Sequence, residues 1–424
     1  MSISKEILKR SIIEKREEVL SLDVVTRPFE FEAAGNYVFV GLRRVGKSYL
    51  LYQRMKELIA KGTSIKDILF VNFEDERLVE LTTEDLDLLL EVHYEMSGYD
   101  KKPILFFDEI QNIAHWDKFV RRLADAKYSI YVTGSNAKML SSDVATTLGG
   151  RFLIYDVYPY SIQEYLRASS VVLSEDWKYS LQKSSQIRAL FESYFNFGGL
   201  PETLYFKDKR SVLQSLYQKI YLGDICTRNS IRNSRVMGLL IKKMAESVRQ
   251  PISYNRIQNI IKSTGNKVTV ATVSEYVDYA IGSCLIFSIE NGLAKISERE
   301  SVKKYYFSDN GLLNLFLIDA APALLENLVA VTLCQRYGKE NVVYMKANQE
   351  IDFYVEEEKT AIQVSYSISD YDTFERETSA LWQFRKQNKD ARLIIITKDE
   401  KEVVEKDGHK IEVIPILDWL LAPK

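Results

Sequence analysis

A glycine-rich octapeptide near the start of the chain has the residue types and spacing that bind phosphate. Residues 41–48 read Gly-Leu-Arg-Arg-Val-Gly-Lys-Ser and match the pattern G-x-x-x-x-G-K-[ST] at each fixed position. The glycines let backbone N–H groups converge on phosphate oxygens, and a following helix adds its dipole. We expect Lys47 to reach the β- and γ-phosphates and the Ser48 hydroxyl to bind Mg²⁺. The predicted nucleotide-binding residues are Gly41, Arg43, Arg44, Val45, Gly46, Lys47, Ser48 and Tyr49.

Two neighbouring carboxylates follow a later apolar run. Asp108 and Glu109 come directly after Pro-Ile-Leu-Phe-Phe at residues 103–107. Downstream of a phosphate-binding loop, the first acid is expected to hold Mg²⁺ and the second to polarise the attacking water as general base. The alternative, a pair of solvated carboxylates at the end of a strand, stays open at this point.

Three further polar residues are candidates for contact with the transferring phosphoryl group. Ser135 and Asn136 follow an apolar run at 128–133, where a polar side chain could contact the water and the γ-phosphate. Both are also ordinary turn residues. Arg151 could stabilise charge on the phosphoryl group, either in cis or in trans through self-association, or it could be a surface residue.

The elements that would position these residues form an α/β pattern. Short, nearly continuous apolar runs predict strands buried on both faces of a parallel sheet, and an amphipathic pattern at 49–60 predicts a helix between the first two. Thr82 with Asp85 predicts another helix start. We therefore expect a doubly wound P-loop NTPase domain over residues 1–165. The strands are predicted at 37–40, 68–73, 104–107 and 130–133.

Two more blocks follow the first. Residues 166–315 are mostly helical, and within them two short helices at 253–263 and 270–281 precede two strands at 284–290 and 303–307 around Asn291-Gly292. This outline is that of a winged helix. Residues 316–424 return to α/β. Their predicted elements are a helix from Ala323 and strands at 342–345, 351–355, 360–364, 393–397 and 411–416.

Composition limits the class of protein. The 424 residues are 46% hydrophobic and 27% charged, which is typical of a globular chain. The net charge is −2, so the chain as a whole has no strong electrostatic field that would favour binding to nucleic acid or to a membrane. Three widely spaced cysteines form no disulfide framework. No apolar run of about 18 residues is present. We expect a cytoplasmic protein that has no membrane partner.

Beyond the isolated motifs, the chain resembles the bacterial and archaeal AAA+-like ATPases. The similarity is carried by GLRRVGKS, LFFDEIQNIAHW, YVTGSNAKML and GGRFLIYDVYPYSIQEYL, and it continues through FGGLPE, FSDNGLLN and LENLVAVTL into NQEIDFYV. Relatives of that family include the origin-recognition and STAND-type ATPases. The resemblance implies ATP and Mg²⁺ as cofactors. It also implies a C-terminal domain of the kind usually fused to this ATPase.

The C-terminal block is similar to the restriction-endonuclease-like pattern. Active members carry a helix Glu, a strand Asp and then [E/Q]-x-K, whose carboxylates hold Mg²⁺ while the lysine helps to activate water. Glu326, Asp352 and Gln363 match, but the lysine position is Ser365, which carries no charge. An inactive nuclease fold used for contacts is favoured, and an active nuclease is the alternative.

A basic segment lies inside the nearly neutral chain. Residues 207–267 contain 13 Lys and Arg against 3 Asp and Glu. Phosphate contacts from this segment would bind DNA in a salt-dependent way. Alternatively, it complements the acidic ATPase domain or a partner subunit.

These patterns predict a nucleotide-driven switch. ATP is favoured over GTP because the chain has no guanine-specific N-K-x-D. Hydrolysis would change how the later regions contact a partner or nucleic acid. The rivals are a nucleic-acid-processing ATPase whose C-terminal domain still cuts, and a scaffold that binds nucleotide without turnover.

Overall fold

The computed structural model describes residues 4–137, 146–174, 176–347 and 349–422, and it divides into two compact units after Val157. The first unit ends eight residues before the predicted boundary at 165. The second and third predicted blocks fall within one compact unit.

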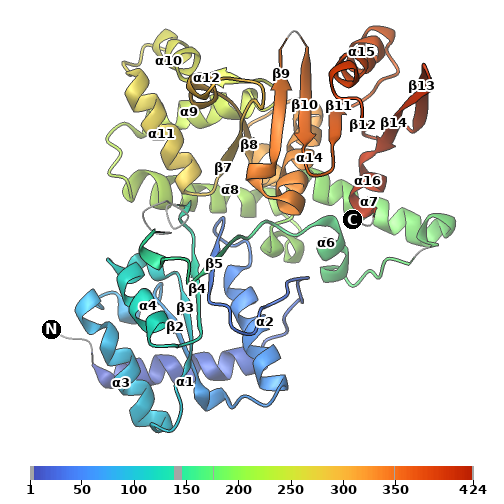
Figure 1. Cartoon of the computed structure of the whole chain (residues 1–424). Coiled ribbons are helices and arrows are strands. Elements are labelled where there is room, and N and C mark those ends of the chain that lie inside the picture. The colour runs from blue at the N-terminus through green and yellow to red at the C-terminus, as the bar shows by residue number, and fades with distance from the viewer. Residues whose placement is uncertain (1–3, 138–145, 175, 348, 423–424) are drawn as a thin grey trace. The chain divides into compact units, whose positions relative to one another are not determined.

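The first unit is built on a five-stranded sheet of order β2-β3-β4-β1-β5 in which every pairing is parallel (Figure 1). All four predicted strands are present, and the α/β P-loop NTPase fold is confirmed. The inner strands are buried almost throughout because helices cover both faces. The sheet also contains β5, which was not predicted. The strands are β1 Tyr37–Val40, β2 Ile68–Asn72, β3 Ile104–Asp108, β4 Ile130–Gly134 and β5 Leu153–Asp156.

Four α-helices of the described residues surround this sheet. The helix predicted at 49–60 begins two residues earlier, directly after the glycine-rich loop, and the chain turns at Gly62 with φ +96°. The Thr82–Asp85 capping box is present, although it opens a short 3₁₀ turn that leads into the next helix. The helices are α1 Lys5–Ser21, α2 Lys47–Ala60, α3 Leu86–Ser97 and α4 Trp116–Asp125.

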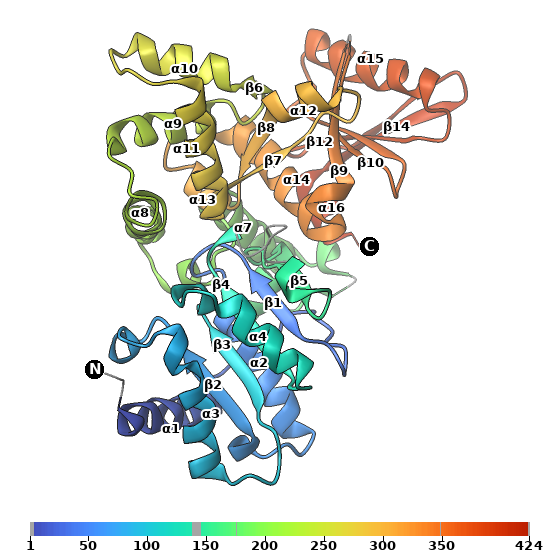
Figure 2. The same ribbon diagram turned by 60° about the vertical axis from the view of Figure 1, so that its left-hand side comes forward.

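The second unit begins with a helical region. None of the described helices in either unit is long and apolar enough to cross a membrane. Figure 2 shows α9, α10 and α11 packed side by side. The helices before the sheets are α6 Ile162–Ala168, α7 Leu181–Phe197, α8 Lys209–Lys219, the π-helix η8 Ile220–Thr227, α9 Ser234–Glu246, α10 Tyr254–Ser263 and α11 Val270–Gly282.

A small antiparallel sheet of order β6-β8-β7 follows. Two helices and two strands lie where the sequence predicts them, and the two strands, β7 and β8, pair antiparallel as a hairpin. The connection between them extends beyond Asn291-Gly292 because the helix α12 intervenes, and Asn291 forms a bridge to Tyr344 of the next sheet. This bridge connects the middle of the chain to its C-terminal part. The elements are β6 Ile252–Ser253, β7 Ile286–Ile289, α12 Ile296–Ser301 and β8 Val302–Phe307.

The C-terminal part contains a six-stranded mixed sheet of order β13-β14-β12-β11-β10-β9. Its central strands β11, β12 and β14 are parallel, and β9, β10 and β13 run antiparallel to their neighbours. The sequence pattern predicted every strand except β13. The elements are α13 Asn310–Leu313, α14 Ala321–Tyr337, β9 Val342–Lys346, β10 Glu350–Val355, β11 Thr360–Val364, α15 Tyr371–Gln387, β12 Arg392–Thr397, β13 Glu402–Lys406, β14 His409–Pro415 and α16 Ile416–Leu421.

A buried carboxylate joins distant parts of the second unit. Asp309 accepts hydrogen bonds from the backbone N–H groups of Gly199 and Gly311 at 2.8 Å and of Leu312 at 3.3 Å. A side chain at Gly198 would place its Cβ 2.0 Å from the Asp309 Oδ1. Glycine is therefore required at position 198. Asp309 thus explains why the motifs FGG at 197–199 and SDNG at 308–311 occur in the same chain, since they contact each other. Burial raises the pKa of Asp309 to about 6, against the effect of these N–H donors.

We predict that Asp309→Ala destabilises the second unit by about 3 kcal/mol, because three buried N–H groups lose their acceptor. Calorimetric unfolding measures this as a lowered Tm. The matched control is Asp370→Ala, which removes the exposed N-cap of α15 and should cost only about 1 kcal/mol. Equal effects of the two variants would show that the Asp309 network does not stabilise the unit.

Candidate nucleotide-binding site

Three strands bring the predicted site residues to one edge of the first sheet. Strand β4 pairs with β1 on one side and with β3 on the other, and all three are parallel. Their carboxyl ends therefore meet, so that the loop after β1, the acids after β3 and Ser135 after β4 share an edge. This is where open α/β sheets bind ligands.

The loop at 41–46 has the backbone conformation that the motif requires. A Cβ at Gly41 would lie 2.3 Å from the Val157 carbonyl oxygen, so only glycine fits. Arg44 has φ +62° and Gly46 has φ +97°. Gly46 is also the N-cap of α2 and provides no side-chain acceptor, so the first turn of α2 keeps its N–H donors for a ligand.

The Lys47 ammonium lies inside this loop. Its Nζ donates to the carbonyl oxygens of Gly41 and Leu42 at 3.1 Å each and lies 3.4 Å from the Glu109 Oε1. The side chain is only 3% exposed. Lys47, the predicted phosphate-binding lysine, and Glu109, the predicted general base, are therefore ion-paired at this edge.

Asp108 is held by two hydroxyls. The Thr133 Oγ1 donates to its Oδ1 at 2.5 Å, and the Ser48 side chain also hydrogen-bonds to it. Burial, reinforced by the charge of Glu109, raises the pKa of Asp108, and these hydroxyls oppose the shift only in part. Ser48 and Asp108, the predicted magnesium ligands, are thus already in contact.

Glu109 has a conformation that few residues other than glycine adopt. Its φ is +54°, which costs of order 1 kcal/mol and is typical of functional sites. Burial disfavours its ionised form, but Lys47, Gln111 and Ser135 more than offset this and hold the pKa of Glu109 below its usual value. Glu109 is therefore an anion facing the Lys47 ammonium.

Two residues that the sequence reasoning missed complete the edge. Thr133 contacts both acids, since its Oγ1 also accepts from the Glu109 N–H at 3.0 Å. The Gln111 Nε2 donates to the Glu109 Oε2 at 2.6 Å and to the Ser135 Oγ at 3.3 Å. Gln111 Oε1 is buried without a partner, so it can accept from a ligand or water. The sequence could have pointed to both residues by their positions: Gln111 comes two residues after Glu109, and Thr133 comes two residues before Ser135.

The other predicted loop residues are placed less deeply. Arg43 pairs with Glu74 at 2.5 Å, whereas Arg44 and Tyr49 are exposed and Val45 is fully buried. Asn136 is half-buried beyond the end of β4.

Comparison with known proteins agrees with this geometry. The family described as "AAA domain" matches residues 35–166, and a domain of unknown function matches residues 188–322. The uncharacterized protein MJ1544 of Methanocaldococcus jannaschii is 31% identical over 439 residues, covering 99% of this chain and 96% of its own. The chain belongs to the same family as MJ1544.

Two further likenesses are weaker. An uncharacterized protein of Haemophilus influenzae is 29% identical over 393 residues, which covers 91% of this chain and 94% of its own. The structure of the Walker-type ATPase PABY2304 of Pyrococcus abyssi aligns with 74% of this chain and 95% of its own, at 16% identity and a TM-score of 0.39.

Arg151 is not brought to the phosphate-binding edge. It precedes β5, and its carbonyl oxygen accepts from Asn36, which precedes β1. Arg151 therefore lies at the amino edge of the sheet, where its guanidinium pairs with Asp125. The fold does not support a cis role for this arginine, because the length of a strand separates it from the loop.

The nuclease-like residues of the second unit do come together. Glu326 on α14, Asp352 on β10 and Gln363 on β11 all line one cavity of about 700 Å³. Ser365 donates to the Ser367 carbonyl oxygen at 2.8 Å. The sequence reasoning missed Lys304 on β8, whose Nζ lies 3.0 Å from the Asp352 Oδ1. The sequence feature that could have pointed to Lys304 is its position as a lysine on the buried face of an otherwise mostly apolar strand.

We predict that Thr133→Val lowers any magnesium-dependent turnover at least about tenfold, because a lost hydrogen bond to a buried charge costs about 1.5 kcal/mol. Phosphate release under saturating ATP measures this. Thr397→Val is the matched control, since Thr397 is equally buried at the end of β12 in the second unit. Undiminished turnover in Thr133→Val would show that this hydroxyl does not position the acids.

Proposed function

We propose that the first unit binds ATP with Mg²⁺ and hydrolyses it, and that the cycle acts as a conformational switch. The observation that supports this most directly is the contact of Lys47 with Glu109 at 3.4 Å, at the edge that also holds the loop and Asp108. The AAA domain match over residues 35–166 favours the same class of ligand.

The donors present fit a nucleotide and its metal. The uncapped first turn of α2 offers N–H groups to phosphate oxygens. Ser48 and Asp108 would hold Mg²⁺, which when bound neutralises charge on the phosphate oxygens. The hydrogen bond between the Ser48 and Asp108 side chains already brings one oxygen atom of each close to the other, as binding to a shared cation would require.

Nucleotide binding would change the partners of Lys47. Its present acceptors include two neutral carbonyl oxygens, and a polyphosphate offers a stronger, charged acceptor. Once the ammonium turns to phosphate, Glu109 loses its ion pair and is free to take a proton from water. Gln111 and Ser135 lie beside Glu109 and would orient that water, with Asn136 beyond them.

We predict opposite outcomes for the two partners of this ion pair. Lys47→Ala should weaken ATP binding at least about tenfold, because it removes the phosphate cation. Glu109→Gln should retain binding within a few-fold and lose at least about a hundredfold in turnover, because it removes the base. Calorimetric titration of ATP and phosphate release measure the two effects.

The control is Glu91→Gln, an exposed carboxylate on α3. It should leave binding and turnover unchanged. Normal hydrolysis by Glu109→Gln would refute its role as base. Wild-type protein that binds ATP and releases no phosphate would favour the scaffold alternative.

Arg151 can contribute only from another copy of the chain. We propose this trans role as the form in which self-association would regulate turnover, since the guanidinium is about a third exposed at the opposite edge of its own sheet. Its partner Asp125 is also partly exposed, so the pair can open at modest cost.

A second candidate function, DNA contact, is supported by the basic segment 207–267. Four of its cations, Arg235 and Lys242 on α9 and Arg256 and Lys262 on α10, are exposed. The ion pairs of the described residues include none of them. The elements α10, α11, β7 and β8 follow one another as in a winged helix, and we propose that this region contacts phosphates.

We predict salt-dependent binding of duplex DNA that is weakened by the double substitution Arg256→Ala and Lys262→Ala. Each lost phosphate contact should lower the salt slope by about 1. Fluorescence anisotropy at low and high salt measures this. The control is the double substitution Lys386→Ala and Lys389→Ala, which removes the same charge around the C-terminal end of α15. It should leave the salt slope unchanged. Absence of binding at low salt would exclude this function.

We further propose that the C-terminal sheet has a restriction-endonuclease-like arrangement. The support is positional: a glutamate of α14 and an aspartate and a glutamine of adjacent strands face one cavity. The missing lysine at Ser365 disfavours cleavage by this arrangement.

A further inference from the structure

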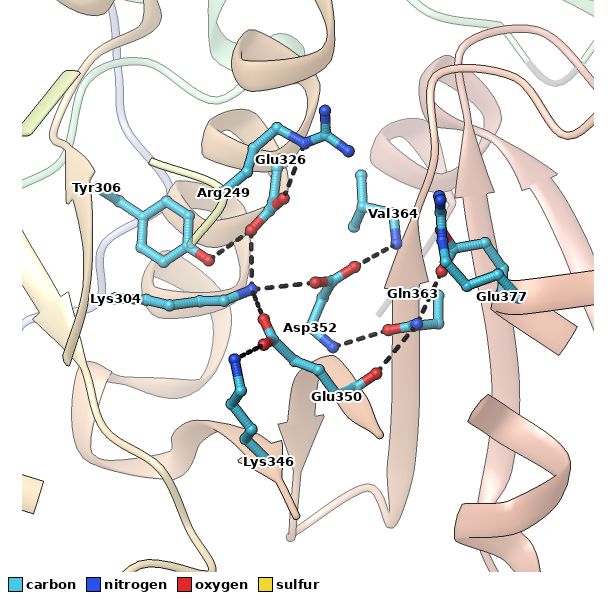
Figure 3. Close-up of polar contacts among 11 residues, drawn as sticks. Arg249, Lys304, Tyr306, Glu326, Lys346, Glu350, Asp352, Gln363, Val364 and Glu377 are labelled. Carbon is cyan, nitrogen blue, oxygen red and sulfur yellow. Dashed lines mark hydrogen bonds and ion pairs between the residues drawn. The ribbon is translucent and has the colours of Figure 1, made fainter. Parts of the chain in front are cut away.

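A buried lysine lies among three carboxylates that line the cavity of the second unit. Lys304 is 0% exposed, and Figure 3 shows its Nζ between three carboxylates. It lies 3.1 Å from the Glu326 Oε1, 2.8 Å from the Glu350 Oε1 and 3.0 Å from the Asp352 Oδ1. The ammonium thus has one carboxylate for each of its three N–H bonds.

The remaining carboxylate oxygens also have partners. The Tyr306 hydroxyl donates to the Glu326 Oε1 at 2.8 Å, and the Arg249 Nε lies 3.6 Å from the Glu326 Oε2. The Lys346 Nζ lies 2.8 Å from the Glu350 Oε2, and the Val364 N–H donates to the Asp352 Oδ2 at 2.9 Å. Each oxygen of the three acids therefore already has a hydrogen-bonding or charged partner.

The charges balance without a metal. Three carboxylates face three cations, Lys304, Lys346 and Arg249. A divalent cation needs several oxygen ligands that converge on one point, and here the ammonium occupies that point. Among the residues that the structure describes, no group of three or more His, Cys, Asp or Glu is arranged to hold a metal ion.

Other residues reinforce this arrangement. The Gln363 side chain accepts from the Asp352 N–H at 2.8 Å and donates to Glu377 at 2.8 Å. The Gln363 side chain therefore orients Asp352 through its backbone, and its amide oxygen is already engaged by the Asp352 N–H. The magnesium that the nuclease-like pattern implies does not fit these residues.

We propose that the Lys304 ammonium is a built-in replacement for the divalent cation, so that this nuclease-like centre is closed to metal and does not cut nucleic acid. This rests on the proposed restriction-endonuclease-like arrangement and adds to it a named residue and a cause. The lysine comes from β8, so it also joins the small sheet to α14 and β10. Removing it should expose a cation site made of Glu326, Glu350 and Asp352.

The test is Mn²⁺ binding to the full chain without nucleotide, followed by electron paramagnetic resonance. The Asp108→Asn background removes the candidate metal ligand of the first unit. In this background Lys304→Ala should bind Mn²⁺ at least about tenfold more tightly than the parent, and Mn²⁺ should raise its Tm. Adding Asp352→Asn should abolish the gain. Lys303→Ala, which removes the neighbouring lysine of the same strand, should gain nothing.

A folded Lys304→Ala variant without a gain in Mn²⁺ affinity would overturn the proposal. If the Lys304→Ala variant does not fold, the test is made on the Asp108→Asn protein that retains Lys304, with and without Asp352→Asn. Mn²⁺ binding in Asp108→Asn that is lost on adding Asp352→Asn would show an open metal site and refute the proposal, whereas equal binding in both would support it. Magnesium-dependent cleavage of DNA that Asp352→Asn abolishes would also refute it. None of these outcomes depends on ATP turnover.

Discussion

A parallel sheet buried on both faces constrains where the first unit can place charge. Its inner strands are apolar and covered by helices, so charged groups can lie only at the strand ends. With strands about 4.8 Å apart, the ends of β1 and β3 are about 10 Å from each other across β4. Lys47 from one and Glu109 from the other meet in this interval, and Thr133 on the intervening strand contacts both acids. Burying two adjacent carboxylates is tolerable because these partners surround them.

The second unit depends on buried charge in a different way. Asp309 joins the turn after α7 to the start of α13, and Lys304 joins β8 to α14 and β10. Each group connects segments that are far apart in sequence. Removing one partner of such a contact leaves either a buried charge or a buried N–H group without its counterpart, which is unfavourable in both cases. This accounts for the packing of the helical middle of the chain and the C-terminal sheet into one compact unit.

The sequence predicted those parts of the candidate site whose residues are neighbours in the chain. The loop 41–48 and the pair Asp108–Glu109 need only local spacing and a preceding apolar run. Thr133, Gln111 and Lys304 could not be assigned, because their partners depend on strand order and register. The inner strands were predictable from continuous apolar runs. The edge strands β5 and β13 are largely exposed; β13 has charged residues at both ends, and the short apolar run at 152–155 that overlaps β5 was not assigned to a strand. The hairpin of β7 and β8 was predictable from its two strands, whereas the bridge from Asn291 to Tyr344 is a long-range contact that the local pattern does not indicate.

The two buried lysines differ in how firmly their present partners hold them. Lys47 has two neutral carbonyl acceptors and one carboxylate at 3.4 Å, so a polyphosphate can compete for it. Lys304 has three carboxylates within 3.1 Å and no exposure, and any competing anion would first have to displace one of them. A carboxylate attracts an ammonium by its opposite charge in addition to the hydrogen bond, which a neutral carbonyl oxygen cannot do. The acceptors around each ammonium, rather than the lysine itself, therefore determine which of the two centres can exchange its partners during a reaction.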